Sequence, residues 1–409
     1  MSRPLVRAAA LLLLAAGGCT RKELPPTAAP SGRGAGPSMP AAVRSAKAAE
    51  AAVARPPICL PENAPSPRAA VAEGRLALDA GDTDRALVCA EDAVRLAPRL
   101  VPALVLRADA LGALDRIEDA RLAWGRALAV DPSNADALLG AAALHVRRLG
   151  PSRDALETGL EYALRGARSP AARRDRTLAA RLALVAGMAE NDLGRSHLAL
   201  PHLERAVAVL KEDADAAYER GVALYELSRL SEAERAFERV LALAPGDAWA
   251  LHQLGLVAER RGDRKRAESL LARARTIDPQ DFPPEVPVDE DAFRGQVREA
   301  IAALPEEERR ALADVPVEIA ELPDTADLLA VDPPLSPSIL GLFRGPSEAE
   351  PCTVEDGPHC RAIVVYRRNL VRFARDQKEL QQQVKVTLLH ELGHLHGEDD
   401  DQLRARGLE

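Results

Sequence analysis

The chain has 409 residues, a length typical of two or three domains. Hydrophobic residues make up 47% of it and aromatic residues only 3%, with Ala, Leu and Arg dominating, which favours helices over sheets. The net charge of -8 is spread along the chain with no long basic run, so we do not expect nucleic acid as a partner.

Residues 1–19 have the features of a bacterial lipoprotein signal peptide: arginines followed by an apolar run too short to span a bilayer. Small residues precede Cys19 and resemble a lipobox, although Ala16 stands where Leu is more usual. The resemblance implies that Cys19 is lipidated after cleavage; the alternative is an ordinary cleaved signal peptide. Because Thr20 follows the cysteine, the resemblance implies an outer-membrane lipoprotein that faces the periplasm and contacts the membrane only through its lipid anchor.

Four further cysteines are consistent with export to an oxidising compartment. Cys352 and Cys360 bracket a short loop and could close a disulfide bond, and Cys59 could pair with Cys89. The alternatives are four free thiols, or a metal site formed by Cys352, His359 and Cys360.

Residues 20–57 are rich in Pro, Ala, Gly and Ser and lack apolar periodicity, which indicates a disordered tether. The chain then repeats itself with a period of 34 residues, and the clean units are 67–100, 101–134, 180–213, 214–247 and 248–281. In each unit the eighth residue is Gly or Ala and the twentieth is Ala, and in four of them a proline follows the expected second helix. A degenerate repeat with an insertion near Gly150 occupies 135–179.

These positions resemble the tetratricopeptide repeat, a helix–turn–helix unit of 34 residues. We therefore expect residues 58–281 to form an α-solenoid, in which small residues let the two helices of each unit approach closely. The resemblance implies a concave face that binds an extended peptide or a partner protein. The alternative is that the array serves only as a spacer or as a dimerisation platform.

Residues 282–409 are expected to form a small α+β domain after a proline-rich linker. Helical spacing and strand alternation predict, in order, a helix over 292–304, strands over 315–322, 339–344 and 361–366, and a long helix over 378–395. The strand over 339–344 could be an edge strand that pairs with an extended substrate, or an ordinary core strand.

The last of these helices contains the sequence His-Glu-Leu-Gly-His at 390–394. His390 and His394 are four residues apart and so lie on one face of the helix, where both imidazoles can bind one Zn²⁺. Glu391 is placed to act as the general base on the water that attacks a carbonyl. A peptidase of this kind needs a third protein ligand and one open position on the metal.

Asp400 is the predicted third ligand, because Gly397 can turn the chain sharply after the helix and present a carboxylate. Other side chains in the same segment remain alternatives: Glu398, Asp399, Asp401 and His396.

Residues 289–409 resemble the minimal zincin family of bacterial metallopeptidases. The similarity includes Phe293, Val297, Ala300, Leu304 and Pro305 in the first helix, the strand 315–319, the stretches 340–345 and 363–370, and the metal motif His390, Glu391, His394, Gly397 and Asp400. The resemblance implies a small mixed sheet packed on the helix, with zinc and peptidase activity. The Cys352–Cys360 loop departs from the family pattern, and the absence of Met after Met188 disfavours a metzincin.

The sequence therefore predicts an α-solenoid of tetratricopeptide repeats followed by a zincin-like domain over 282–409. The expected function is a zinc metalloendopeptidase of the bacterial envelope, with a solenoid that docks the substrate or a partner protein. The competing hypothesis is a non-enzymatic adaptor lipoprotein whose metal site is structural or idle.

Overall fold

The computed structural model describes residue 59 and residues 66–150, 152–352 and 360–408. The expected signal peptide, Cys19, the tether over 20–57 and His359 lie outside the described residues. The chain divides into two compact units, 17–132 and 133–409, and each is considered separately. Within the described residues, no helix is both long enough and apolar enough to cross a bilayer.

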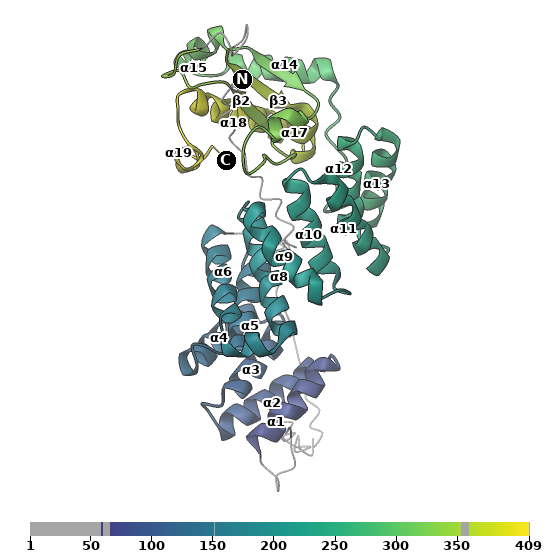
Figure 1. Ribbon diagram of the computed structural model, residues 1–409, viewed down its shortest axis with the longest axis vertical. Helices are drawn as coiled ribbons and strands as arrows, with labels where there is room; N and C mark the ends of the chain where they lie inside the picture. Colours follow the sequence, from purple (N-terminus) through teal and green to yellow (C-terminus); the bar gives the residue numbers. More distant parts are fainter. Residues whose placement is uncertain (1–58, 60–65, 151, 353–359, 409) are drawn as a thin grey trace, which may run out of the picture. The chain divides into compact units, whose positions relative to one another are not determined.

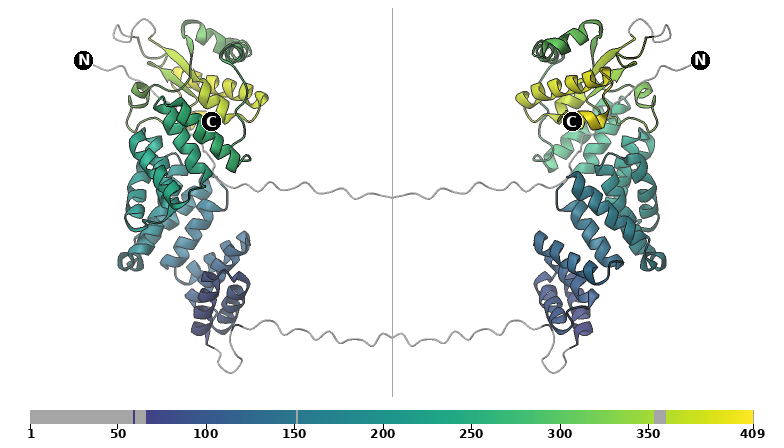
Figure 2. Two further views of the ribbon diagram at one scale, coloured as in Figure 1. Left: turned by 90° about the vertical axis from the view of Figure 1, so that its right-hand side faces the viewer. Right: turned by 90° about the vertical axis from the view of Figure 1, so that its left-hand side faces the viewer.

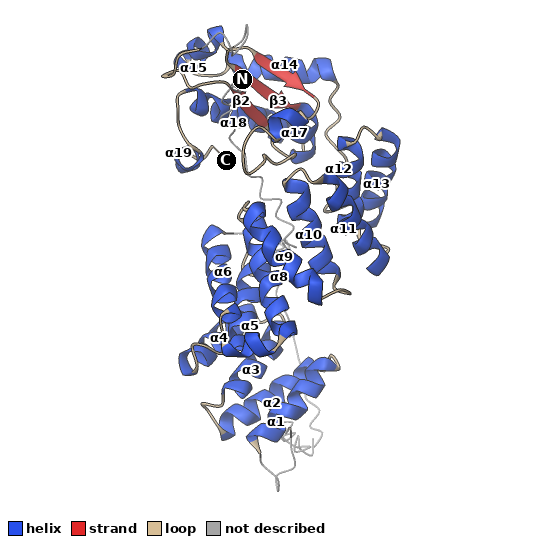
Figure 3. Cartoon of the chain, viewed as in Figure 1, coloured by secondary structure: helices blue, strands red, loops and turns tan. Residues whose placement is uncertain are grey.

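The first unit contains two antiparallel helix pairs (Figures 1 and 3). Its helices are α1 (Pro67–Asp79), α2 (Thr83–Leu96), α3 (Val101–Ala113) and α4 (Ile117–Val130). A disulfide joins Cys59, which precedes α1, to Cys89 in α2, with the two Cα atoms 4.6 Å apart. Cys89 is fully buried, and Asp92 accepts a hydrogen bond from the Cys59 backbone, so the residue before the first repeat is held against α2.

The second unit begins with further helix pairs, α5 (Ala135–Arg147) with α6 (Arg153–Ala167), α8 (Arg176–Asp192) with α9 (Ser196–Val209), α10 (Ala214–Glu226) with α11 (Leu230–Leu243) and α12 (Ala248–Arg260) with α13 (Arg264–Ile277). The degenerate repeat is thus a real helix pair, and the short helix α7 (Pro170–Arg174) accounts for its longer tail. As expected, small residues mark the contact between helices: a side chain at Gly221 would collide with the ring of Phe237. The mostly helical solenoid precedes a small mixed sheet, which confirms the predicted fold class.

The sheet belongs to the C-terminal domain of the same unit (Figures 2 and 3). The elements of this domain are α14 (Glu290–Ala302), α15 (Glu306–Ala311), a 3₁₀ turn (Leu312–Asp314), β1 (Val317–Ala320), α16 (Thr325–Leu328), β2 (Gly341–Arg344), β3 (Ala362–Tyr366), α17 (Arg367–Phe373), α18 (Gln377–Leu395) and α19 (Asp400–Ala405). The strand order is β1-β3-β2, with β3 parallel to β1 and antiparallel to β2. β2 is therefore an edge strand, although its first three residues are buried.

Alternating residues of β3 build the two faces of the sheet. Ile363 and Val365 join the apolar core formed with α14 and α18, whereas Val364 and Tyr366 pack on the opposite face with Leu328. The face occupied by α14 and α18 is the one that matters for chemistry, because α18 contains the predicted metal motif.

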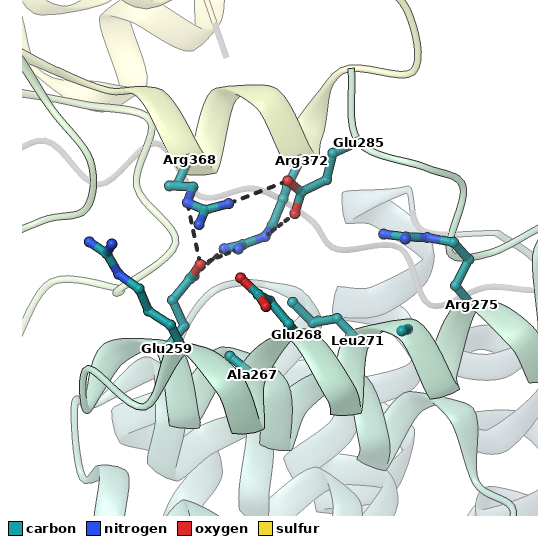
Figure 4. Close-up of a pocket in the computed structure, with 10 residues that line it drawn as sticks. Glu259, Ala267, Glu268, Leu271, Arg275, Glu285, Arg368 and Arg372 are labelled. Atoms are coloured by element: carbon teal, nitrogen blue, oxygen red, sulfur yellow. Dashed lines mark hydrogen bonds and ion pairs between the residues drawn. The ribbon is translucent and has the colours of Figure 1, made fainter. Parts of the chain in front are cut away.

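A cluster of ion pairs fastens the last helix pair of the solenoid to the C-terminal domain (Figure 4). Both guanidinium ends of Arg372 in α17 lie 2.6 Å from the carboxylate of Glu259 in α12, and its Nε lies 3.1 Å from Glu285. Only 15% of the Arg372 side chain and 8% of the Glu259 side chain are exposed. Arg368 adds longer contacts to the same two carboxylates, and the cluster lines a cavity of about 330 Å³.

Candidate metal centre

The helix α18 positions the predicted ligands. Asp376 caps its first turn by accepting a hydrogen bond from the backbone N–H of Glu379. Its apolar face, made by residues such as Leu380, Val384 and Leu388, is buried in the core of the domain. The predicted metal motif occupies the last turns of the same helix, where His390, Glu391 and His394 are all buried.

The structure brings His390, His394 and Asp400 together. The two Nε2 atoms are 3.0 Å apart, and each lies 3.6 Å from Oδ1 of Asp400. Three ligands of a tetrahedral zinc ion, with bonds of about 2.0–2.1 Å, are separated by about 3.3 Å. The spacing of these three atoms therefore matches what one zinc ion requires.

Backbone carbonyl groups fix the direction of both imidazoles. Nδ1 of His390 lies 2.6 Å from the carbonyl oxygen of Leu408, and Nδ1 of His394 lies 2.9 Å from that of Glu398. Because a carbonyl oxygen only accepts, each Nδ1 carries the proton, and each neutral ring presents the lone pair of Nε2. These lone pairs face each other and the buried Oδ1 of Asp400, an arrangement that a divalent cation stabilises.

Two glycines allow Asp400 to reach the histidines. Gly397 has φ +87°, and the N–H groups of Gly397 and Glu398 bond back to the carbonyls of His394 and Gly393, which ends α18 in a Schellman motif. The chain then enters α19, whose buried Leu403 packs directly on Gly393. A side chain at Gly393 would collide with Leu403, so this close approach sets the position of Asp400 at the start of α19.

The other acidic and imidazole side chains near the motif have different partners. The ring of His396 lies between Glu308 and Glu348, at 3.2 and 3.0 Å. Glu398 forms an ion pair with Arg406, and Asp401 forms one with Arg404. Asp399 caps the N-terminus of α19. The structure therefore favours Asp400 over these alternatives as the third ligand.

Glu391 is fully buried, and neither of its carboxylate oxygens has a hydrogen-bond partner among the described residues. Burial raises the pKa of Glu391 to about 8, while the charge of His390 and the backbone of Phe343 act in the opposite direction more weakly. A buried carboxyl group without a partner is costly in a purely structural role. Its place beside His390 is the one expected of a general base next to a metal.

The two histidines have opposite pKa shifts. Burial, followed by the neighbouring His390, lowers the pKa of His394. Burial also acts to lower the pKa of His390, but the nearby carboxylates of Asp400 and Glu391 outweigh it and raise that pKa. The lowered pKa of His394 favours its neutral form, which is the form that binds a metal.

The predicted cysteine pairs are both joined in the structure. The Cα atoms of Cys352 and Cys360 are 5.8 Å apart, and the guanidinium of the next residue, Arg361, donates to the carbonyls of Pro346, Ser347 and Glu350. With its sulfur in a disulfide, neither Cys352 nor Cys360 can act as a thiolate ligand. The alternative metal site with His359 is thereby disfavoured.

Several contributors to the site were not anticipated from the sequence. They are the carbonyl of Leu408, the carbonyl of Glu398, and the Gly393–Leu403 contact. Backbone carbonyl groups have no sequence signature. The one available signal for the helix contact was a glycine inside an otherwise regular helix, where it has a cost of about 1 kcal/mol.

Comparisons with known proteins agree with this architecture. Residues 312–408 match the family model of zincin-like metallopeptidases, and residues 184–248 and 227–284 match two models of the tetratricopeptide repeat. A search of curated proteins finds no significant match.

Solved structures with a similar helical array have low identity to this chain. YrrB, described as a tetratricopeptide-repeat protein with an unusual peptide-binding site, is 24% identical with a TM-score of 0.38, over 47% of this chain and 93% of that one. PilF of Pseudomonas aeruginosa is 17% identical with a TM-score of 0.45, over 53% and 94% of the two chains. PilW, described as a type IV pilus biogenesis factor, is 18% identical with a TM-score of 0.45, over 53% and 96%.

Because these TM-scores are all below 0.5, the similarity to these structures supports no inference about the partners of this chain. The family matches are more informative, because the metallopeptidase model covers every residue of the metal motif. They imply a metal, typically zinc, and a capacity for protein interaction. The chain thus combines tetratricopeptide repeats with a zincin-like metallopeptidase domain at its C-terminal end.

Proposed function

We propose that the C-terminal domain is a zinc-dependent endopeptidase. The observation that carries the proposal is the convergence of His390, His394 and Asp400, with their ligand atoms 3.0–3.6 Å apart, beside the buried and unpartnered carboxyl of Glu391. A structural metal site needs no such carboxyl group, and zinc sites of that kind use four protein ligands. Among the described residues, three side chains form the candidate group, which leaves one position open.

His390, His394 and Asp400 would hold the zinc ion. Zinc, when bound, supplies Lewis acidity that polarises a substrate carbonyl and lowers the pKa of water. Glu391 takes a proton from the attacking water at its carboxylate and delivers it to the leaving amine. Leu408 and Glu398 keep the imidazoles in the orientation and tautomer that binding requires.

The edge strand β2 would bind the substrate backbone. Among the described residues, it pairs with β3 on one side and with no strand on the other. It passes across the turn of α18 that contains Glu391, since a side chain at Gly341 would lie 2.8 Å from Oε1 of Glu391. An extended peptide that adds to the free edge of β2 would therefore lie next to the general base. This placement suits cleavage within a peptide rather than hydrolysis of a small ester.

The solenoid would dock the substrate or a partner protein, as the repeat family implies. On sequence grounds, we also propose that Cys19 is lipidated and anchors the protein in the outer membrane, facing the periplasm. A tether followed by a solenoid would then place the peptidase away from the bilayer.

The test is proteolysis of an unfolded protein by the zinc-loaded chain and by Glu391→Gln. The substitution keeps the volume of the side chain and removes its basicity. We expect the variant to keep its zinc and its fold and to lose cleavage by on the order of 10²–10⁴-fold. If both proteins bind the same partner and neither cleaves any substrate, the chain is an adaptor and the metal site is idle.

A further inference from the structure

A second cavity lies between the solenoid and the metal centre. Its volume is about 320 Å³, close to that of the cavity at Arg372. Three segments line it: the start of α9 with the residues before it, the end of α10, and the loop over 331–336 that precedes β2. The remaining lining residue is Asp400 itself, so the cavity opens at a proposed metal ligand.

Asp400 belongs both to the metal centre and to the lining of the cavity. Its Oδ1 is buried and faces the histidines, whereas 45% of the side chain as a whole remains exposed. A group bound in the cavity would therefore lie next to a proposed metal ligand. A side chain of a substrate held at the metal centre could enter the cavity from there.

The loop faces the end of α10. Ser336 lies near enough to the carboxylate of Glu226 to lower its pKa, and Ser338 has the same effect on Tyr225, the preceding residue of α10. Arg260 of α12 donates to the carbonyl of Pro323 in the same domain. The solenoid and the C-terminal domain are thus joined by a direct hydrogen bond, and both contribute walls to the cavity.

The lining of this cavity is apolar and acidic. Its apolar wall consists of Leu227, Val331, Pro333, Pro334 and Leu335. Its ionisable groups are the carboxylates of Glu226, Asp332 and Asp400 and the imidazole of His197 at the start of α9, so carboxylates outnumber the one basic group, and neither lysine nor arginine is among the lining residues. The cavity at Arg372, by contrast, is lined by four arginines. Apolar walls with carboxylates fit a side chain that has a long aliphatic stem and a cationic end.

Glu226 is the carboxylate best placed to recognise such a cation. It is half-buried, and it forms no ion pair with any residue that the structure describes. Burial raises the pKa of Glu226 to about 6, against a smaller lowering effect of Ser336. A cationic partner would compensate the buried charge.

We propose that this cavity receives a lysine or arginine side chain of the substrate, with Glu226 of the solenoid as its specificity-determining residue. The proposal rests on the peptidase function proposed above and adds the substrate class to it. It also gives the solenoid a direct part in the substrate-binding site of the neighbouring domain. A peptide with an acidic residue at the same position would be rejected by repulsion from Glu226 and Asp332.

The test measures peptide binding separately from cleavage. The zinc-loaded full chain with Glu391→Gln is titrated by fluorescence anisotropy with N-acetylated peptides and with the same peptides that carry a free N-terminus. Each pair of peptides has lysine or the uncharged norleucine at one position, and the position is moved along the peptide. In one register we expect lysine to bind about tenfold more tightly or better, as for a charge-assisted hydrogen bond.

Substitutions at Glu226 test whether this residue causes the preference for lysine over norleucine. Added to the same chain, Glu226→Gln should reduce the lysine-to-norleucine ratio to about two or less, and Glu226→Lys should favour a glutamate peptide instead. The matched control is Glu238→Gln, which removes an equal charge from a half-exposed side chain on α11 and should leave the ratio intact. Circular dichroism and zinc content establish that each variant is folded.

The outcomes separate this inference from the peptidase proposal. If lysine binds no more tightly than norleucine at any peptide position, or if Glu226→Gln keeps the full lysine-to-norleucine ratio, the cavity does not bind a basic side chain. This conclusion would hold even if the wild-type chain cleaves peptides. If the preference appears without any cleavage, the binding assignment stands and the peptidase proposal fails. If only peptides with a free N-terminus bind tightly, the cavity takes an α-ammonium group and the side-chain assignment is wrong.

Discussion

The contact between Gly393 and α19 gives a sharp prediction, because it positions a ligand without touching the metal. In Gly393→Ala, the new Cβ would lie 2.8 Å from Oε2 of Glu398 and closer still to the side chain of Leu403. Leu403 is the buried anchor of α19, a helix of six residues, so α19 moves more readily than the long helix α18. We expect the substitution to push Asp400 away from His390 and His394.

The magnitude follows from two opposing effects. An alanine inside a helix gains about 1 kcal/mol over glycine. Overpacking at a filled contact has a cost of about 1–3 kcal/mol. The free energy of unfolding should therefore change by no more than about 2 kcal/mol. The zinc affinity should fall on the order of 10–100-fold, the loss typical of a disturbed ligand-orienting residue.

The assay is competition for zinc between the protein and a chromophoric chelator. The matched control is Gly295→Ala in α14, where the nearest neighbour of the new Cβ is the end of Arg298 at 3.9 Å. That control should keep its zinc affinity and gain about 0.5–1 kcal/mol in stability. If Gly393→Ala binds zinc as tightly as the control, the Gly393–Leu403 contact does not position Asp400 and the reasoning is refuted.

Three further predictions concern stability. Glu259→Ala leaves Arg372 with Glu285 as its remaining partner and should lower the free energy of unfolding in urea by about 3 kcal/mol; a loss below about 1 kcal/mol would contradict the coupling role of the pair. Burial raises the pKa of Glu219 from 4.5 to about 7, so its protonated form stabilises the fold below pH 4.5 and that stability is lost as the pH rises to 7. Urea titrations at several pH values should show wild type losing about 2 kcal/mol relative to Glu219→Gln across that range, and parallel curves would exclude the shift. Replacing Cys59 and Cys89 by alanine should lower the stability of the first unit by about 3–4 kcal/mol in thermal unfolding, whereas an unchanged midpoint would mean that the bond does not constrain the unfolded chain.

Local patterns predicted much of the fold. The 34-residue period placed the helix pairs, because each repeated small residue marks a contact such as that between Gly221 and Phe237. The predicted helix over 378–395 differs by one residue from α18, since Asp376 caps its start and Gly397 ends it. The strand predicted over 315–322 is shorter in the structure, Val317–Ala320, because the prolines at 316 and 323 have no N–H to donate to a neighbouring strand.

The parts of the site that were not predictable depend on tertiary contacts. Two histidines four residues apart meet on any helix, but Asp400 reaches them only because Leu403 packs on Gly393. The cavity beside Asp400 was even less predictable, because its walls come from segments more than 100 residues apart in the sequence, at Glu226 and Leu335. No periodicity or motif encodes a contact of that range.

The most direct test is the zinc content of the purified, desalted full chain, measured by inductively coupled plasma mass spectrometry. The geometry of His390, His394 and Asp400 predicts one zinc ion per chain in the wild type and in Glu391→Gln, and almost none in His390→Ala. A folded wild-type chain that takes up no zinc from a zinc-containing buffer would contradict the central claim, as would a His390→Ala variant that still holds one ion.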